Sequence, residues 1–220
     1  MITVLATKSR SLWQKERLLH AKIGVVSYDA IQIDFLPYAY KGSIKNAIFT
    51  SQNAVRSVFR DQKSTISNCF CVGEKTKALL EENGQKVIKM AQNASELAKF
   101  VVKNYKNEVF TFFHGNLKRA ELPLALEENN ISFNSVEVYR TTLVPKRFNR
   151  TFNGILFFSP SAVQSFMLEN SMQDQIAFCI GNTTAEALKK HTNSICIANK
   201  PTIENTIVQV IKYYTSDIVR

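Results

Sequence analysis

The sequence of 220 residues is poor in the features that mark membrane-spanning and exported chains. No apolar run approaches the ~18 residues that a membrane-spanning helix needs. The stretch from residue 1 to residue 7 begins apolar, but it is too short for a signal-peptide core and no basic region precedes it. With 45% apolar and 21% charged residues, the composition is that of an ordinary globular protein, and we expect a cytoplasmic one without contact to a membrane.

Cysteine is scarce as well, and its spacing excludes the common zinc sites. The chain has four cysteines, with no Cys-x-x-Cys pair and no histidine at zinc-site spacing. We expect no metal ion, and we interpret the four as reduced core residues of a cytosolic protein: Cys69, Cys71, Cys179 and Cys196.

The motifs of nucleotide binding and nucleophilic catalysis are also missing. The sequence has no Gly-x-x-x-x-Gly-Lys-Ser/Thr, no Gly-x-Gly-x-x-Gly, no Gly-x-Ser-x-Gly and no paired-carboxylate motif. Its three histidines are isolated: His20 and His191 lie at helix ends, and His114 lies at a strand end, where a role in a site is not favoured. An enzyme of this composition would rely on positioning and hydrogen bonds, and we expect no cofactor.

Basic residues outnumber acidic residues, and the resulting positive charge favours anionic partners. Lys and Arg number 28 against 18 Asp and Glu, giving a formal net charge of +10. Nucleic acid, an acidic membrane surface and a polyanionic small molecule all fit this charge, as does a merely soluble basic surface. The basic residues are scattered, without a block of five or more, which argues against a nucleic-acid-binding arm.

The most informative feature that is present is an internal repeat. A shift of 108 positions aligns residues 46–105 with residues 154–213 without a gap, and thirteen of the 60 positions are identical. The identities gather in two pairs of motifs: 49–55 with 157–163, and 70–76 with 178–184. We therefore expect two copies of one architecture.

Each copy alternates nearly continuous apolar strands with helical segments, a pattern typical of parallel sheets covered on both faces. The expected strands are 46–50, 69–72 and 86–90 in the first copy, and 154–158, 176–180 and 194–198 in the second. The expected helices are one after Ser51, then 75–83 and 94–104, and in the second copy 160–168, 182–190 and 202–214.

The unrepeated segments are expected to complete the two sheets. Strands 108–113 and 131–138, around helix 117–128, should finish the first copy's sheet, and strands 2–6 and 23–35, around helix 11–20, should finish the second's. This predicts an α/β fold of two flavodoxin-like parallel-sheet domains joined by a two-stranded linker. The predicted boundaries are 1–36 with 145–220 for one lobe, 42–137 for the inserted lobe, and 37–41 with 138–144 for the hinge.

The repeated motifs lie at the carboxyl ends of the predicted strands, where open parallel sheets bind ligands. Strand-to-helix turns there offer backbone N–H groups and short hydroxyls to an anion. The alternative is local, because Ser and Thr are also favoured as plain helix N-caps. The candidate substrate-binding residues are Thr50, Ser51, Gln52, Gly73, Thr76, Gly115, Asn116, Ser159, Pro160, Ser161, Gly181, Thr183 and Thr184.

With these motifs in this order, nearly the whole chain resembles the uroporphyrinogen-III synthase family. The segments that carry the resemblance are 48–55, 71–76, 138–141, 157–163 and 180–185. The sequence departs from the family pattern at Thr7-Lys8-Ser9, where Thr-Arg-Pro is common, and at Gln52, where Pro is usual. Asn129-Asn130 replaces a helix-ending glycine, and asparagine is the next-best residue for a left-handed cap.

The resemblance implies two lobes that hold hydroxymethylbilane, a linear tetrapyrrole with eight carboxylates, between them. The implied reaction removes water, inverts the terminal pyrrole ring D and closes the macrocycle to uroporphyrinogen III, without cofactor or metal. Tyr139 is the candidate catalytic residue, which assists departure of the hydroxyl by hydrogen bond or proton donation. We expect the protein to be a monomer. A linker tyrosine packed for structure is the alternative for Tyr139. For the whole chain, the alternatives are a non-catalytic two-lobed polyanion-binding protein and a nucleic-acid binder, the latter disfavoured by the scattered charge.

Overall fold

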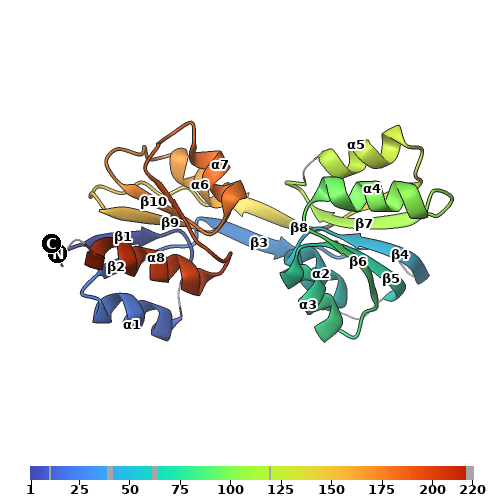
Figure 1. Ribbon diagram of the computed structural model, residues 1–220, viewed down its shortest axis with the longest axis horizontal. Coiled ribbons are helices and arrows are strands. Elements are labelled where there is room, and N and C mark those ends of the chain that lie inside the picture. Colours follow the sequence, from blue (N-terminus) through green and yellow to red (C-terminus); the bar gives the residue numbers. More distant parts are fainter. Residues whose placement is uncertain (10, 39–41, 61–63, 119, 217–220) are drawn as a thin grey trace. The chain divides into compact units, whose positions relative to one another are not determined.

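Two sheets, each covered by helices on both faces, organise the chain in the computed structural model (Figure 1). The structure describes residues 1–9, 11–38, 42–60, 64–118 and 120–216. The chain divides into two units: Met1–Gln32 with Thr142–Arg220, and Ile33–Thr141. The points of division are 32/33 and 141/142. The second lies within the predicted hinge segment 138–144, and the first precedes the predicted segment 37–41, of which residues 39–41 lie outside the described residues.

The first unit contains a five-stranded sheet of order β11-β10-β9-β1-β2, whose neighbouring strands are all parallel. Its strands are β1 (Thr3–Ala6), β2 (Gly24–Ser27), β9 (Gly154–Phe157), β10 (Ile176–Cys179) and β11 (Ile195–Ile197). One face packs on α1 (Leu12–His20) and α8 (Ile203–Ser216), and the other on α6 (Pro160–Met167) and α7 (Asn182–Leu188).

The second unit contains a six-stranded sheet of order β3-β8-β7-β4-β5-β6, in which the pairs β8–β7, β7–β4, β4–β5 and β5–β6 are parallel. Its strands are β3 (Ile31–Phe35), β4 (Gly42–Phe49), β5 (Ser64–Val72), β6 (Val87–Ala91), β7 (Phe110–Gly115) and β8 (Phe133–Leu143). Its helices are α2 (Gln52–Phe59) and α3 (Glu74–Glu82) on one face, and α4 (Ala94–Asn104) and α5 (Glu121–Glu128) on the other.

The two sheets share one spatial order, as the repeat predicts. The repeated strands β4, β5 and β6 hold the same places as β9, β10 and β11, and β7 and β8 hold the places of β1 and β2. Each unit is thus a doubly wound parallel sheet, and the first takes two of its strands from the start of the chain. The predicted α/β fold class is confirmed.

The assignment of residues 23–35 to one sheet is wrong in part. β2 joins the first sheet as expected, but β3 lies beside β8 at the edge of the second sheet, where the Leu36 N–H donates to the Val138 carbonyl at 2.9 Å. Strand β8 is also longer than the predicted 131–138, so Tyr139 lies inside a strand. Helix α5 begins at Glu121 rather than at residue 117, because residues 116 and 117 form a turn.

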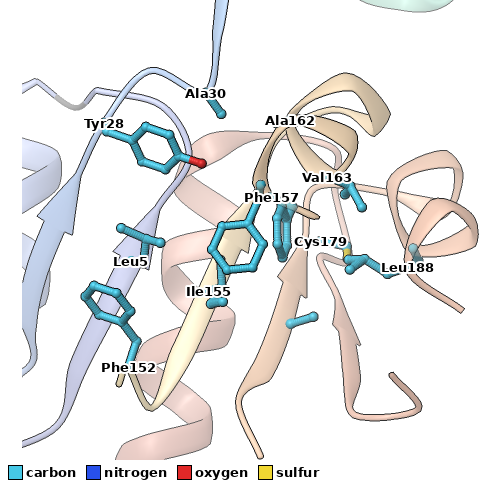
Figure 2. Packing of buried hydrophobic residues seen from close by; sticks show 13 residues of the cluster. Leu5, Tyr28, Ala30, Phe152, Ile155, Phe157, Ala162, Val163, Cys179 and Leu188 are labelled. Atoms are coloured by element: carbon cyan, nitrogen blue, oxygen red, sulfur yellow. The ribbon is translucent and has the colours of Figure 1, made fainter. Parts of the chain in front are cut away.

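Fully buried aromatic and aliphatic side chains hold each sheet to its helices. Figure 2 shows one such cluster in the first unit, to which Leu5 of β1, Phe157 of β9 and Val163 of α6 belong. Burying side chains of this size removes about 1.5–3 kcal/mol of unfavourable hydration each. Cys69, Cys71 and Cys179 are free and buried in these clusters, in agreement with their interpretation as core residues, whereas Cys196 is half-buried.

The ends of three helices follow the capping signals in the sequence. Ser51 and Ser159 cap α2 and α6 with their side chains. Helix α5 ends at Glu128, and Asn130 takes a left-handed conformation with φ of 57° in place of a glycine.

Candidate functional site

The sheet of the second unit gathers eight predicted site residues at one edge. Thr50, Ser51 and Gln52 follow β4; Gly73 and Thr76 follow β5; Gly115 and Asn116 end β7; and Tyr139 lies on β8. Since β8, β7, β4 and β5 are successive parallel strands, their carboxyl ends meet at the same edge.

Tyr139 lies directly opposite Gly115 in the β7–β8 register, next to an irregularity in the pairing. A Cβ atom on Gly115 would lie 2.5 Å from both Cε2 and Cζ of the Tyr139 ring. No side chain fits at such distances, so the close approach of the tyrosine ring requires glycine at position 115. The half-buried ring also packs against the core between the sheet and α2 and α3.

The environment of Tyr139 keeps its phenol protonated. Burial raises the pKa of Tyr139 above its usual value of 10, and a hydrogen bond with the side chain of Ser51 opposes this rise as the smaller effect. At neutral pH the group is therefore a neutral hydrogen-bond and proton donor in a partly desolvated setting. Such a donor can assist the departure of a hydroxyl group.

Asn116 has both ends of its side-chain amide engaged by the backbone of β8. Its Nδ2 donates to the Thr141 carbonyl at 3.1 Å, and its Oδ1 accepts from the Thr141 N–H at 2.8 Å. These bonds continue the β7–β8 pairing past Gly115 and hold the backbone two residues beyond Tyr139. The Asn116 side chain thus fixes the strand that carries the tyrosine.

Ser51 and Ser159 occupy equivalent positions in the two units. Ser51 Oγ accepts from the Asn53 N–H, and Ser159 Oγ accepts from the Ala162 N–H, both at 3.1 Å. Both hydroxyls therefore act as N-caps, the local role that the sequence left open. Pro160 stands at the first position of α6, where it has no N–H to offer, and Ser161 follows it half-buried.

The two Gly-x-x-Thr motifs also form matching turns. The Thr76 N–H donates to the Gly73 carbonyl at 3.0 Å, and the Thr184 N–H donates to the Gly181 carbonyl at 3.1 Å. The hydroxyl-bearing side chains of both threonines are buried, whereas Thr183 is exposed. Only Gly73 has a positive φ, 85°, so only this glycine is required by its backbone conformation.

The first unit brings its own predicted residues together at the carboxyl ends of β9 and β10, which are neighbours. Sequence reasoning missed the next strand along, β1, whose end occupies the place that β7 has in the second sheet. There Thr7 is buried and donates its hydroxyl to the Leu156 carbonyl at 2.9 Å, and Ser9 bonds both oxygens of Asp29. The repeat alone does not reveal this place, because β1 lies outside the repeated segment.

A polar cluster near Gly115 was also not expected. His114, Lys118 and Ser135 lie within hydrogen-bond distance of one another, although His114 is buried. The only signal in the sequence is the basic loop after strand 108–113, in which Arg119 lies outside the described residues.

Neither a metal centre nor a membrane span is found in the part of the chain that the structure covers. Within the described ranges, no group of three or more His, Cys, Asp or Glu side chains is placed to hold a metal ion. No helix among these residues is long and apolar enough to cross a membrane.

Comparison with known proteins gives the family of the chain. A family model described as uroporphyrinogen-III synthase HemD matches residues 23–207. The chain belongs to the uroporphyrinogen-III synthase family. The resemblance expected from the sequence motifs is thereby confirmed.

Individual relatives of this family are similar in sequence over part of the chain and in fold over nearly all of it. The porphyrin biosynthesis protein HemD of Ruminiclostridium josui is 33% identical over 98 residues, which cover 40% of this chain and 19% of that protein. The chain thus matches about a fifth of the length of this relative.

Solved structures of family members share the fold. The uroporphyrinogen-III synthetase of Helicobacter pylori 26695 aligns with a TM-score of 0.69 at 19% identity, covering 97% of this chain and 100% of its own. A mutant uroporphyrinogen III synthase of the extremely thermophilic bacterium Thermus thermophilus aligns with a TM-score of 0.74 at 12% identity, covering 99% and 100%.

Proposed function

We propose that this protein is a uroporphyrinogen-III synthase that cyclises hydroxymethylbilane to uroporphyrinogen III with inversion of ring D and loss of water. Membership of the family supports this function. The observation that carries it is the half-buried phenol of Tyr139 at the carboxyl edge of its sheet, opposite Gly115 and hydrogen-bonded to the side chain of Ser51. A non-catalytic polyanion-binding protein is not favoured, because the family match spans residues 23–207.

In this reaction Tyr139 assists the loss of the hydroxyl group. The phenol donates a hydrogen bond or its proton to the hydroxyl oxygen, the C–O bond breaks, and water leaves behind an azafulvenium cation. The substituted carbon of ring D attacks this cation to give a spiro intermediate, which opens and recloses with ring D inverted. A proton then leaves the ring, and the product differs from the substrate by one water molecule.

Because the azafulvenium cation forms readily, the main task of the protein is to decide which carbon attacks. Positioning of the substrate supplies this control, and it needs many anchors rather than a strong base or nucleophile. We propose that the predicted residues of both units bind the acetate and propionate side chains, with Ser51, Thr76, Ser159, Thr183, Thr184 and neighbouring backbone amides as the principal groups. The net charge of +10 supports a polycarboxylate substrate.

The Tyr139→Phe variant tests the assigned role. We expect turnover to fall by roughly 10²-fold, the lower range for the loss of a general acid, with an unchanged thermal midpoint. Steady-state consumption of hydroxymethylbilane gives the rate, and far-ultraviolet circular dichroism on heating gives the midpoint. Unchanged turnover would remove Tyr139 from the mechanism.

The Thr184→Ala variant tests substrate binding by the first unit. We expect a higher KM for hydroxymethylbilane, because Thr184 belongs to the turn after β10 that is proposed to hold a carboxylate. Leu188→Ala, four residues along the same helix and fully buried, serves as a control for a purely structural loss. An unaltered KM and rate in Thr184→Ala would count against the residue.

We further propose that the enzyme is a cytoplasmic monomer that uses no cofactor and binds no nucleic acid. Four free cysteines and the scattered basic residues support this proposal. Sedimentation equilibrium of the purified chain at micromolar concentration tests the monomer, for which a mass near 25.0 kDa is expected.

A further inference from the structure

The cluster of His114, Lys118 and Ser135 holds a lysine ammonium among neutral groups. His114 lies on β7 with only 6% of its surface exposed. Its Nδ1 is 2.9 Å from the carbonyl oxygen of Gly115, and because a carbonyl only accepts, Nδ1 carries the ring proton. The other ring nitrogen, Nε2, is therefore a hydrogen-bond acceptor.

Lys118 is fixed by this acceptor and by the hydroxyl of Ser135. Its Nζ lies 3.1 Å from His114 Nε2 and donates to Ser135 Oγ at 2.6 Å. Ser135 Oγ is itself 2.8 Å from His114 Nε2. Two of the three ammonium protons are thus directed to groups without negative charge, and the third remains for a ligand.

No carboxylate neutralises this lysine among the residues that the structure describes. The nearby acidic residue Glu137 pairs instead with Arg140, at 3.0 Å. A cation that is positioned by neutral partners keeps its full charge available for an anion, and bonds from an ammonium to a carboxylate are stronger than neutral ones.

Lys118 follows the strand end that carries the candidate site of the second unit, and its side chain turns back over the α4–α5 face of the sheet, on which His114 and Ser135 lie. Lys118 is three residues past the end of β7, and its N–H donates to the Gly115 carbonyl at 3.2 Å. Gly115 in turn contacts the ring of Tyr139. The loop that carries the ammonium is therefore anchored on the residue that makes room for the tyrosine.

We propose that Lys118 binds one carboxylate of the substrate, and that His114 and Ser135 act as positioning residues that hold its ammonium in place. This assignment rests on the proposed function, because it takes the polycarboxylate tetrapyrrole as the ligand. The family match assigns these three residues no role.

The Lys118→Ala variant tests the proposal in two assays. We expect KM for hydroxymethylbilane to rise about tenfold while kcat changes less than about twofold, since a bond to a charged group is lost without touching the reacting atoms. Affinity for uroporphyrin III, a stable octacarboxylate, should fall by a similar factor in a fluorescence titration. Lys103→Ala is the matched control: it removes the same charge from the exposed end of α4 and should change neither value.

Ser135 variants separate positioning from mere stability. Ser135→Ala should raise KM by about threefold with kcat and thermal midpoint unchanged, and Ser135→Thr, which keeps the hydroxyl, should restore KM. If the wild-type chain forms uroporphyrinogen III but Lys118→Ala matches it in KM and in uroporphyrin affinity, the carboxylate assignment is overturned. If the wild-type chain forms no type III isomer but Lys118→Ala still loses uroporphyrin affinity, the binding site stands and the proposed activity fails.

Discussion

A methyl group at position 115 should disable the enzyme by displacing Tyr139. In Gly115→Ala, the new Cβ would lie 2.5 Å from two carbon atoms of the tyrosine ring, against an ordinary contact distance of about 3.5–4.0 Å. The ring must therefore move by about 1 Å. A misplacement of about 1 Å can reduce a rate by roughly 10²-fold, and overpacking of this kind costs about 1–3 kcal/mol of unfolding free energy. We thus expect kcat to fall by up to about 10²-fold, with a thermal midpoint lower by a few degrees.

Gly154→Ala is the matched control for this variant. Its Cβ would lie 2.8 Å from Phe178 Cε2 and 2.9 Å from Tyr214 Oη, so it creates a similar clash, but in the core of the other unit. It should lower the free energy of unfolding by a comparable amount and leave the rate per folded molecule unchanged. Urea unfolding and hydroxymethylbilane consumption on the same samples give both quantities.

A double variant shows whether Gly115 acts through the tyrosine. If it does, Gly115→Ala combined with Tyr139→Phe should be no slower than the slower single variant, because one group is being removed twice. Two independent, multiplying losses, or a Gly115→Ala variant with wild-type kcat, would refute the reasoning.

Three further predictions concern stability and reactivity. Burial lowers the pKa of His114 below 6.5, so the folded state favours the neutral histidine. The contribution of this group to the free energy of unfolding should be fully present above pH 6.5 and should be lost as pH falls through the lowered pKa. Urea unfolding at pH 7.5 and pH 5 should therefore show a smaller decline in stability for His114→Asn than for the wild type. Phe157→Ala should cost about 3–5 kcal/mol in urea unfolding, because this ring is fully buried between β9 and α6; a loss below about 1 kcal/mol would contradict the packing. Burial raises the pKa of Cys69 and Cys179 to about 12, so a thiol reagent at pH 8 should label the half-buried Cys196 first in the native protein. Rapid labelling of Cys69 and Cys179 would show that the core around them is accessible to the reagent.

The repeat made most of the fold predictable. Apolar periodicity locates strands and helices but does not say which strands pair. The 108-residue offset adds that β4, β5 and β6 share one arrangement with β9, β10 and β11, and the structure gives the order itself. Residues 31–35 show the limit. Their alternating pattern indicates a strand, yet their membership of the second sheet depends on pairing with β8, more than 100 residues away.

The sequence predicted the location of the candidate site better than the contacts among its side chains. Strand ends and turn motifs locate its edge, because parallel strands bring their carboxyl ends together. The sequence does not show why position 115 must be glycine, because the requirement arises from the Tyr139 ring on another strand. The same is true of Ser135, which only the register of β7 and β8 brings to His114.

Isomer analysis of the product tests the central claim most directly. Freshly prepared hydroxymethylbilane is incubated with the folded wild-type chain, the products are oxidised, and the type I and type III porphyrins are separated by chromatography. A synthase gives predominantly type III, well above the enzyme-free control. Type I alone from a folded sample would contradict the proposed function and leave a polyanion-binding protein as the better account.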